Sequence, residues 1–464
     1  MKEQDMCDSI ELSFSVGHID TTNHPKCWPL VINSKATHDG ELLNRRTSRV
    51  TAKSPLTKAK YEIRPEVTPV EGGNYAVRGY TVSVNMPAGT VNTNALLDIL
   101  VFMAALCARR MLQCYLLDNH CPWEVVKQVS LSEAALTSVD LTSLMLGSEK
   151  VSAEVMKKDL EKRASTLLLS SRMRRENSLS KVTSFTEDNI YTVYVHHSRG
   201  MRLKAYVKDR PTSKSFCDLP KDVEKAVFLE SAKYLRVEAK LGAAWFRQHP
   251  EFSSLQSWKN PKKARAMQKA VFVELRNMLG LDMEFRKRAP KPKYEEKLTP
   301  AQKEVLTAYL KGEDILEHEA LKGMTKQYVS KVKKAIWEKL HIDVDIPWKE
   351  HARIPKLEWF EYPGRYVLPK HLAHLAEYAF VRETVNEKLV LLREEVRRRR
   401  MQSETVPVLE TVNPLPTVHA VAPLVAKASP CTPGVKASVP VAKVAAEWVA
   451  RMKHKHNIGT GLKK

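Results

Sequence analysis

The sequence has few cysteines, and they do not form close pairs. Seven are spread over the 464 residues, at positions 7, 27, 107, 114, 121, 217 and 431, with no Cys-x-x-Cys spacing. An odd and scattered set argues against a disulfide scaffold and against a zinc ribbon or finger. We therefore expect a chain that folds around a hydrophobic core in a reducing compartment such as the cytoplasm.

Long apolar runs are also missing. The start, MKEQDMCDSIELSFS, has no apolar h-region, so we expect no signal peptide. The most apolar stretch, residues 95–117, is interrupted by Asp98, Arg109 and Arg110. Its uninterrupted part is too short to cross a bilayer and predicts a buried helix over residues 94–117, so we expect no membrane partner. There is no GxxxxGK[ST] loop of the kind that binds nucleoside triphosphates.

Negative charge is scarce relative to positive charge. The chain carries 75 Lys and Arg against 53 Asp and Glu, a formal net charge of +22. An excess of this size favours a polyanionic partner, most often nucleic acid. Apolar residues make up 43% of the chain, which is enough for at least one sizeable core.

Patterning divides the chain into five parts. Residues 1–257 alternate between strand-like and helix-like segments, and several strands have the period-two alternation of an antiparallel sheet. The later parts are a basic helix and linker (258–298), a helix-turn-helix-like domain (299–350), a C-terminal helical segment (351–403) and a disordered basic tail rich in Pro and Val (404–464). We expect an α+β fold: an antiparallel sheet with flanking helices, then an all-α domain, a long helix over residues 369–400 and the tail.

The segment 299–350 has the signals of a small helical domain. Thr299 and Pro300 predict the start of a helix, and Gly312 predicts its end. The next predicted elements are a short helix (314–321), a basic helix (325–340) and a strand or wing (341–348). This order suits a helix-turn-helix, although a helical subdomain that only packs on the sheet is the alternative. The candidate DNA contacts are Thr325, Lys326, Gln327, Ser330 and Lys334.

Three predicted strands carry polar residues on one face. Residues 137–142, 201–208 and 234–241 alternate, so every second side chain points away from the core. The polar-face residues of interest are Asp140, Arg202, Lys204, Tyr206, Lys208, Arg236 and Glu238. If the three strands are neighbours in one sheet, these side chains form a single site.

Such a site has the chemistry to act on a phosphodiester. Carboxylates such as Asp140 and Glu238 are hard ligands suited to Mg²⁺ or Mn²⁺. Tyr206 is a candidate nucleophile, and the nearby cations Arg202 and Lys204 can neutralise a phosphate. The alternative is an ordinary antiparallel sheet with a solvated polar face.

The same segments resemble the gene II/X-type replication initiation proteins of filamentous phages and related plasmids. The likeness is carried, in order, by Val139–Asp140–Leu141–Thr142, Ala205–Tyr206–Val207–Lys208 and Leu235–Arg236–Val237–Glu238. It implies a nicking and joining domain over residues 1–257. In that domain Tyr206 would attack DNA, Asp140 and Glu238 would hold the metal, and Lys208 and Arg236 would stabilise the phosphate.

The resemblance implies a rolling-circle replication initiator, a site-specific endonuclease. It would nick the plus-strand origin through a tyrosine-phosphate intermediate and later rejoin the displaced strand. The expected partners are origin DNA, both double- and single-stranded, and host helicase and polymerase in a bacterial cytoplasm. Two alternatives stay open: a non-enzymatic DNA-binding regulator with a helix-turn-helix, and a plasmid mobilisation relaxase.

Overall fold

The computed structural model describes residues 7–19, 32–36, 42–47, 49–69, 75–95, 97–98, 100–211, 219–363 and 366–405. All of them lie within one compact unit of the chain, Met1–Pro407. Nearly all of the predicted tail, residues 404–464, therefore lies outside the described residues. Within the described ranges, no helix has both the length and the apolar character needed to span a membrane.

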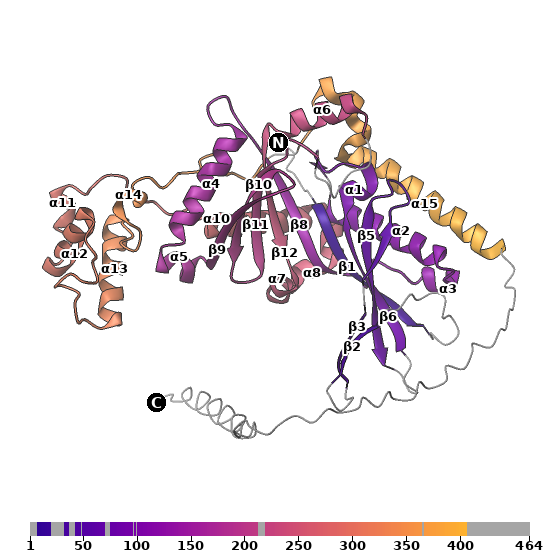
Figure 1. The fold of residues 1–464 in the computed structure, drawn as a ribbon, viewed down its shortest axis with the longest axis horizontal. Coiled ribbons are helices and arrows are strands. Elements are labelled where there is room, and N and C mark those ends of the chain that lie inside the picture. Colours follow the sequence, from indigo (N-terminus) through magenta and orange to yellow (C-terminus); the bar gives the residue numbers. More distant parts are fainter. Residues whose placement is uncertain are drawn as a thin grey trace, which may run out of the picture. The chain divides into compact units, whose positions relative to one another are not determined.

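A nine-stranded antiparallel sheet is the centre of the fold (Figure 1). The strands run in the order β4-β5-β6-β1-β8-β12-β11-β10-β9. Their bounds are β1 Cys7–Ile19, β4 Val50–Lys53, β5 Lys60–Pro69, β6 Tyr75–Asn85, β8 Ala135–Leu146, β9 Leu179–Glu187, β10 Ile190–His197, β11 Met201–Val207 and β12 Tyr234–Leu241. The predicted α+β class with a large antiparallel sheet is confirmed.

Helices pack against the apolar face of this sheet. The hydroxyl of Tyr61 on β5 donates to the carbonyl of Met111 in α2 (Val101–Asp118) at 3.0 Å. The hydroxyl of Tyr191 on β10 donates to Glu161 in α4 (Ala153–Leu167) at 2.6 Å. Along the same face, Val271 and Phe272 of α10 (Pro261–Met278) lie against β8 and β12. The polar side chains of the central strands point the other way.

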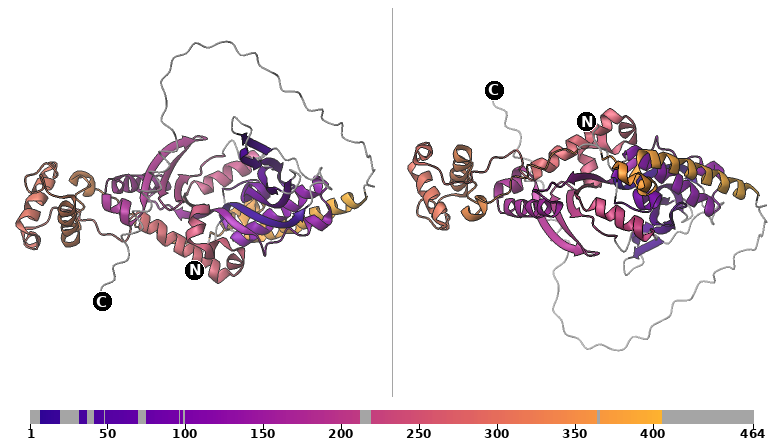
Figure 2. Two further views of the ribbon diagram at one scale, coloured as in Figure 1. Left: turned by 90° about the horizontal axis from the view of Figure 1, so that it is seen from below. Right: turned by 90° about the horizontal axis from the view of Figure 1, so that it is seen from above.

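Shorter helices and one long helix complete the unit. The long C-terminal helix α15 (Arg382–Thr405) lies along α2, and Arg399 donates to the carbonyl of Cys114 at 3.1 Å (Figure 2). The others are α1 Met86–Val91, α3 Trp123–Val126, α5 Ser171–Glu176, α6 Lys221–Ser231, α7 Ala243–Gln248, α8 Pro250–Ser253, α9 Leu255–Lys259, α11 Pro292–Glu295, α12 Pro300–Lys311, α13 Lys326–Leu340, α14 Trp348–His351 and the 3₁₀ helix η3 Lys370–Tyr378. A separate hairpin joins β2 (Ile32–Ala36) to β3 (Leu42–Thr47).

Two predicted helices begin later than the sequence indicates, for one shared reason. β7 (Leu97–Asp98) pairs in parallel with β13 (Phe380–Val381), so neither segment is helical there. The predicted helix over 94–117 therefore starts at Val101. The predicted long helix over 369–400 is η3, then β13, then α15. Pairing between distant segments overrides local helical periodicity, and Phe380 is completely buried at this junction.

Helices α12 and α13 share a smaller hydrophobic core of their own. Thr299 caps α12 in a capping box with Gln302, and Gly312 ends the helix at φ 84°, as the sequence predicts. The predicted short helix over 314–321 is wrong, because the segment forms turns. There the Asp314 carboxylate and the His318 ring accept from backbone N–H groups that a helix would use. The predicted strand or wing over 341–348 is also absent from this described segment.

This helical region contains a buried histidine that should make the free energy of unfolding depend on pH. His351 is 0% exposed, and its Nε2 accepts from the backbone N–H of Asp343 at 3.1 Å. Burial lowers the pKa of His351 to about 4.

We expect the free energy of unfolding to fall as the pH drops from about 6.5 to 4, because the unfolded chain binds the proton first. Two and a half pKa units correspond to a loss of up to about 3 kcal/mol. Urea denaturation at pH 7, 5 and 4 measures this, with His351→Gln as the control that keeps an acceptor but does not titrate. Equal acid slopes for the two proteins would contradict the assignment.

Candidate functional site

Strand pairing brings the predicted polar faces together. β12 lies between β8 and β11, as a single site requires. Tyr206 is directly opposite Arg236, and Asp140 is directly opposite Lys240. Directly paired residues project to the same side of a sheet, so these side chains share the polar face.

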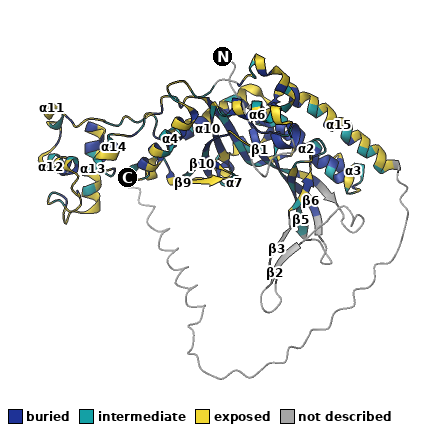
Figure 3. Cartoon of the chain, turned by 45° about the horizontal axis from the view of Figure 1, so that its top comes forward, coloured by how far each residue is buried: buried dark blue, intermediate teal, exposed yellow. Residues whose placement is uncertain are grey.

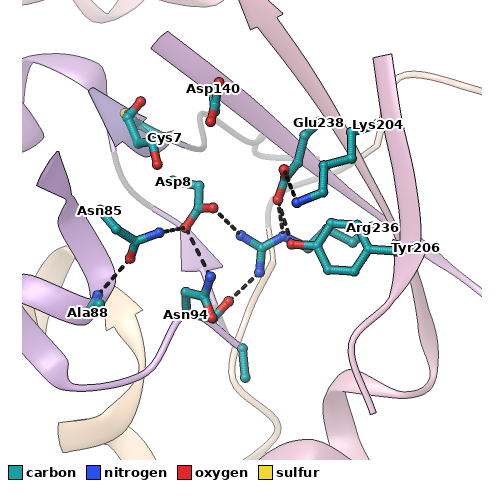
Figure 4. A network of polar contacts seen from close by, with 12 residues as sticks. Cys7, Asp8, Asn85, Ala88, Asn94, Asp140, Lys204, Tyr206, Arg236 and Glu238 are labelled. Atoms are coloured by element: carbon teal, nitrogen blue, oxygen red, sulfur yellow. Dashed lines mark hydrogen bonds and ion pairs between the residues drawn. The ribbon is translucent and has the colours of Figure 1, made fainter. Parts of the chain in front are cut away.

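A buried hydrogen-bond network links Tyr206 to two charged residues of β12 (Figure 4). Its hydroxyl donates to Oε1 of Glu238 at 2.7 Å. Nε of Arg236 donates to the same oxygen at 2.7 Å, and Nζ of Lys204 lies 3.5 Å from Oε2. Tyr206, Arg236 and Glu238 are each less than 5% exposed. The tyrosine is therefore held in one orientation by a carboxylate that two cations neutralise.

Asp8 completes this network, and the sequence motifs do not indicate it. Its Oδ2 forms an ion pair with Arg236 at 3.1 Å, and its Oδ1 accepts from Asn85 at 3.1 Å. Arg236 also donates to the backbone carbonyl of Asn94. Asp8 lies near the start of β1, where a single carboxylate beside an alternating strand carries no recognisable pattern. The pairing of β1 with β8 is what brings it to the site.

The network forms one wall of a cavity of about 220 Å³. The residues that line it are Asp8, Ser9, Asn85, Asn94, Asp140, Glu187, Asp188, Ile190, Thr192, Lys204, Tyr206, Lys208 and Glu238. Five of the predicted site residues thus meet at one cavity, and Arg236 lies behind them. The lining mixes carboxylates with two lysines and one phenol.

Burial and charge shift the pKa values around the cavity in opposite directions. Burial raises the pKa of the Tyr206 phenol well above its usual value, so the phenol is neutral and donates. Burial opposes ionisation of Glu238 too, but Lys204 and Arg236 outweigh it and hold the pKa of Glu238 at about 2. Burial raises the pKa of Asp140 to about 7 and lowers that of Lys208 to about 7. The charge of this cavity is therefore adjustable near neutral pH.

The donors fit a divalent cation in part. Oδ1 of Asp140 is buried and, among the described residues, accepts no hydrogen bond; its ion pair with Lys240 is 3.7 Å long. Glu238 offers only Oε2, since Tyr206 and Arg236 occupy Oε1. No three His, Cys, Asp or Glu side chains in the described ranges could hold a metal by themselves. Mg²⁺ commonly uses one or two carboxylates plus phosphate oxygens and water, which this set can provide.

The other candidate DNA contacts lie in two different places. Lys204 belongs to the network, and the Arg202 guanidinium lies 5.1 Å from the ring centre of Tyr194 on the same sheet face. Thr325 caps α13, with its hydroxyl accepting from the backbone N–H of Tyr328. Gln327 follows in the exposed first turn of α13.

The remaining three candidates line a cleft between α13 and α5. Lys326, Ser330 and Lys334 lie along one face of α13, and much of this helix is exposed (Figure 3). The cleft has a volume of about 910 Å³. Its other wall carries three arginines: Arg172, Arg174 and Arg175. The connection between α12 and α13 spans 312–325, which is longer than the three- or four-residue turn of a helix-turn-helix.

Comparisons with known proteins found no relative of this chain. Neither the family models, nor the curated proteins, nor the solved structures include a match to the chain.

The buried network should make Arg236 more important for stability than Tyr206. Arg236→Met leaves Asp8 and Glu238 without their shared cation, and we expect a loss of about 3–5 kcal/mol in the free energy of unfolding. Tyr206→Phe removes one hydrogen bond to a carboxylate that keeps two cations, at a cost of about 1.5–3 kcal/mol. Chemical denaturation gives both values.

The matched control is Arg210→Met, at an arginine whose side chain is 51% exposed. This change should stay within about 0.5 kcal/mol of the unmodified protein. If Arg236→Met were as mild as the control, the network would not be holding the sheet together.

Proposed function

We propose that this chain is a rolling-circle replication initiator that nicks and rejoins DNA through Tyr206. The observation that carries the proposal is a hydrogen bond: the Tyr206 hydroxyl donates to Glu238 at the wall of a cavity that Asp140 and Lys208 also line. A tyrosine, carboxylates and lysines around one cavity are the groups that phosphoryl transfer to a protein nucleophile requires. The gene II/X-like motifs supply the same residues in sequence.

In the proposed nicking step, the phenolic oxygen of Tyr206 attacks the scissile phosphorus, and its proton passes to Glu238, which already accepts its hydrogen bond. The bond from phosphorus to the 3′-oxygen breaks, and that oxygen leaves as a 3′-hydroxyl after taking up a proton. The 5′-phosphate stays covalently bound to Tyr206. Attack by a later 3′-hydroxyl on this phosphotyrosine reverses the step and closes the strand, so no nucleotide hydrolysis is needed.

The network positions the Tyr206 hydroxyl, but burial and the hydrogen bond to Glu238 both oppose ionisation and raise the pKa of the phenol. Glu238 accepts the phenolic hydrogen bond, and Nζ of Lys204 lies 4.4 Å from the ring centre. With a pKa of about 2, Glu238 is a weak base, so the phenolate must be stabilised by the surrounding cations. Arg236 is 1% exposed and would act through Glu238 as a positioning residue, while Lys208 lines the cavity and can face the phosphate.

A divalent cation such as Mg²⁺ would be held by Asp140, with Glu238 as a second ligand. When bound, it would neutralise charge on a phosphate oxygen. Asp140 has the better-placed oxygen, because its buried Oδ1 accepts no hydrogen bond within the described residues.

The direct test is a nicking assay on supercoiled DNA that carries the cognate origin, with Mg²⁺. Tyr206→Phe should abolish nicking and the covalent protein–DNA adduct while DNA binding is retained. Asp140→Asn should lower the nicking rate by at least about a hundredfold and raise the Mg²⁺ concentration needed. Adduct formation by Tyr206→Phe would refute the assignment of the nucleophile.

A non-enzymatic DNA-binding regulator remains the second candidate, favoured by one specific observation. Tyr206 is only 4% exposed, which also suits a structural role within the sheet. For this function, binding without nicking would be seen in the same assay. A mobilisation relaxase would instead nick a transfer origin and not support replication.

The cleft between α5 and α13 provides phosphate contacts under either function. Arg174, Arg175, Lys326 and Lys334 are exposed on its two walls. Contacts of this kind fix the position of DNA without reading its sequence.

Neutralising one wall should therefore weaken binding to all sequences alike. We expect Arg174→Ala plus Arg175→Ala, or Lys326→Ala plus Lys334→Ala, to reduce the slope of log affinity against log salt by about 1 to 2. Titration of labelled DNA at several salt concentrations measures the slope. Lys221→Ala plus Lys225→Ala, on exposed positions of α6, removes the same charge and should leave the slope unchanged. Equal slopes for all variants would rule out the cleft.

A further inference from the structure

Beside the Tyr206 site, three side chains form a stack on the polar face of the sheet. The rings of Phe185 on β9 and Tyr194 on β10 are parallel, with centres 4.8 Å apart and planes 14° apart. The Arg202 guanidinium on β11 lies 5.1 Å from the centre of the Tyr194 ring. The stack thus crosses three neighbouring strands, with an arginine at one end and a phenylalanine at the other.

Register places the outer end of this stack in the same row as the proposed nucleophile, two strands away. Phe185 is directly opposite Thr192, and Thr192 is directly opposite Tyr206. These three residues form one row across β9, β10 and β11, so the backbones at Phe185 and Tyr206 are two strand spacings, about 10 Å, apart. Thr192 and Glu187 belong to the lining of the same cavity as Tyr206.

Phe185 lies on the edge strand β9 and is a highly exposed aromatic residue of the nine-stranded sheet. It is 48% exposed, whereas the Tyr194 ring beneath it is 6% exposed. Because one face of the Phe185 ring covers Tyr194, its exposure belongs largely to the opposite face. An open aromatic face that rests on a second ring and an arginine is a rigid surface on which another planar group can stack.

We infer that Phe185 is a stacking platform for an unpaired nucleobase of the strand on which Tyr206 acts. The inference rests on the proposed function for the identity of that strand. Bases in a duplex are covered on both faces by their neighbours, so the platform selects single-stranded DNA. Exposed or partly exposed cations on the same sheet face, Lys181, Arg202 and Lys204, can accompany the phosphates.

The test uses the full chain with Tyr206→Phe, so that strand cleavage cannot disturb the measurement. A fluorescently labelled single-stranded oligodeoxynucleotide of mixed base sequence is titrated by anisotropy. Adding Phe185→Leu, which keeps an apolar side chain but removes the aromatic face, should weaken binding about fivefold or more. Phe185→Tyr keeps the face and should bind like the parent.

An oligonucleotide of abasic residues separates stacking from phosphate contacts. With this probe the parent and Phe185→Leu should bind equally, because no base is present to stack. Equal binding of the normal oligonucleotide by both proteins would overturn the platform. So would a fivefold difference that persists with the abasic probe.

The outcome is independent of whether the chain is a nickase. Nicking by the unmodified protein together with unchanged binding by Phe185→Leu would refute the platform and leave the nicking function intact. Base-dependent loss of binding in Phe185→Leu, without any nicking by the unmodified protein, would support the platform and refute the role of Tyr206.

Discussion

The buried guanidinium of Arg236 is the interaction on which the site depends. It joins Asp8 on β1, Glu238 on its own strand and the carbonyl of Asn94 before β7. Burying a charge is costly unless it is paired and hydrogen-bonded, so the position of each partner is tightly constrained. A shift of β12 by one residue would turn Arg236 and Glu238 into the apolar core. The charge pairing therefore fixes the strand register that presents Tyr206.

Alternation was the part of the structure that the sequence specified well. It predicted β12 with its observed bounds, and it separated the polar and apolar faces of β11 correctly. Alternation identifies a face but not a neighbour, so it could not indicate that Asp8 would come to Arg236. The same limit explains β7 and β13, which are two residues long and exist only because they pair across the fold.

The α5–α13 cleft could not be predicted from local sequence patterns either, because its two walls come from distant segments. Sequence patterning predicted α13 as a basic helix, and the arginines of α5, Arg172, Arg174 and Arg175, lie across the cleft from it. Their meeting depends on contacts that no local pattern encodes: Ser170 donates to Asp343 at 2.5 Å, and Lys333 pairs with Asp345 at 2.6 Å. The long connection between α12 and α13 came instead from Asp314 and His318, whose side chains compete with helical hydrogen bonds.

The charged side chains form two different sets, one buried around Tyr206 and one exposed at the α5–α13 cleft. Around Tyr206 two carboxylates, Asp8 and Glu238, are balanced by Arg236 and Lys204, so the buried network adds little to a long-range field. In the cleft Lys334 pairs with Glu338 at 3.6 Å, but Arg174, Arg175 and Lys326 form no ion pair within the described residues and extend their field into solvent. A phosphodiester that enters the balanced cavity adds a negative charge and needs a positive one to compensate. Lys208, with a pKa near 7, can become fully protonated, and under the proposed function Asp140 would hold a divalent cation. The proposed chemistry thus depends on a buried network whose own charges cancel and on neighbouring cavity residues that can gain positive charge when a phosphate arrives.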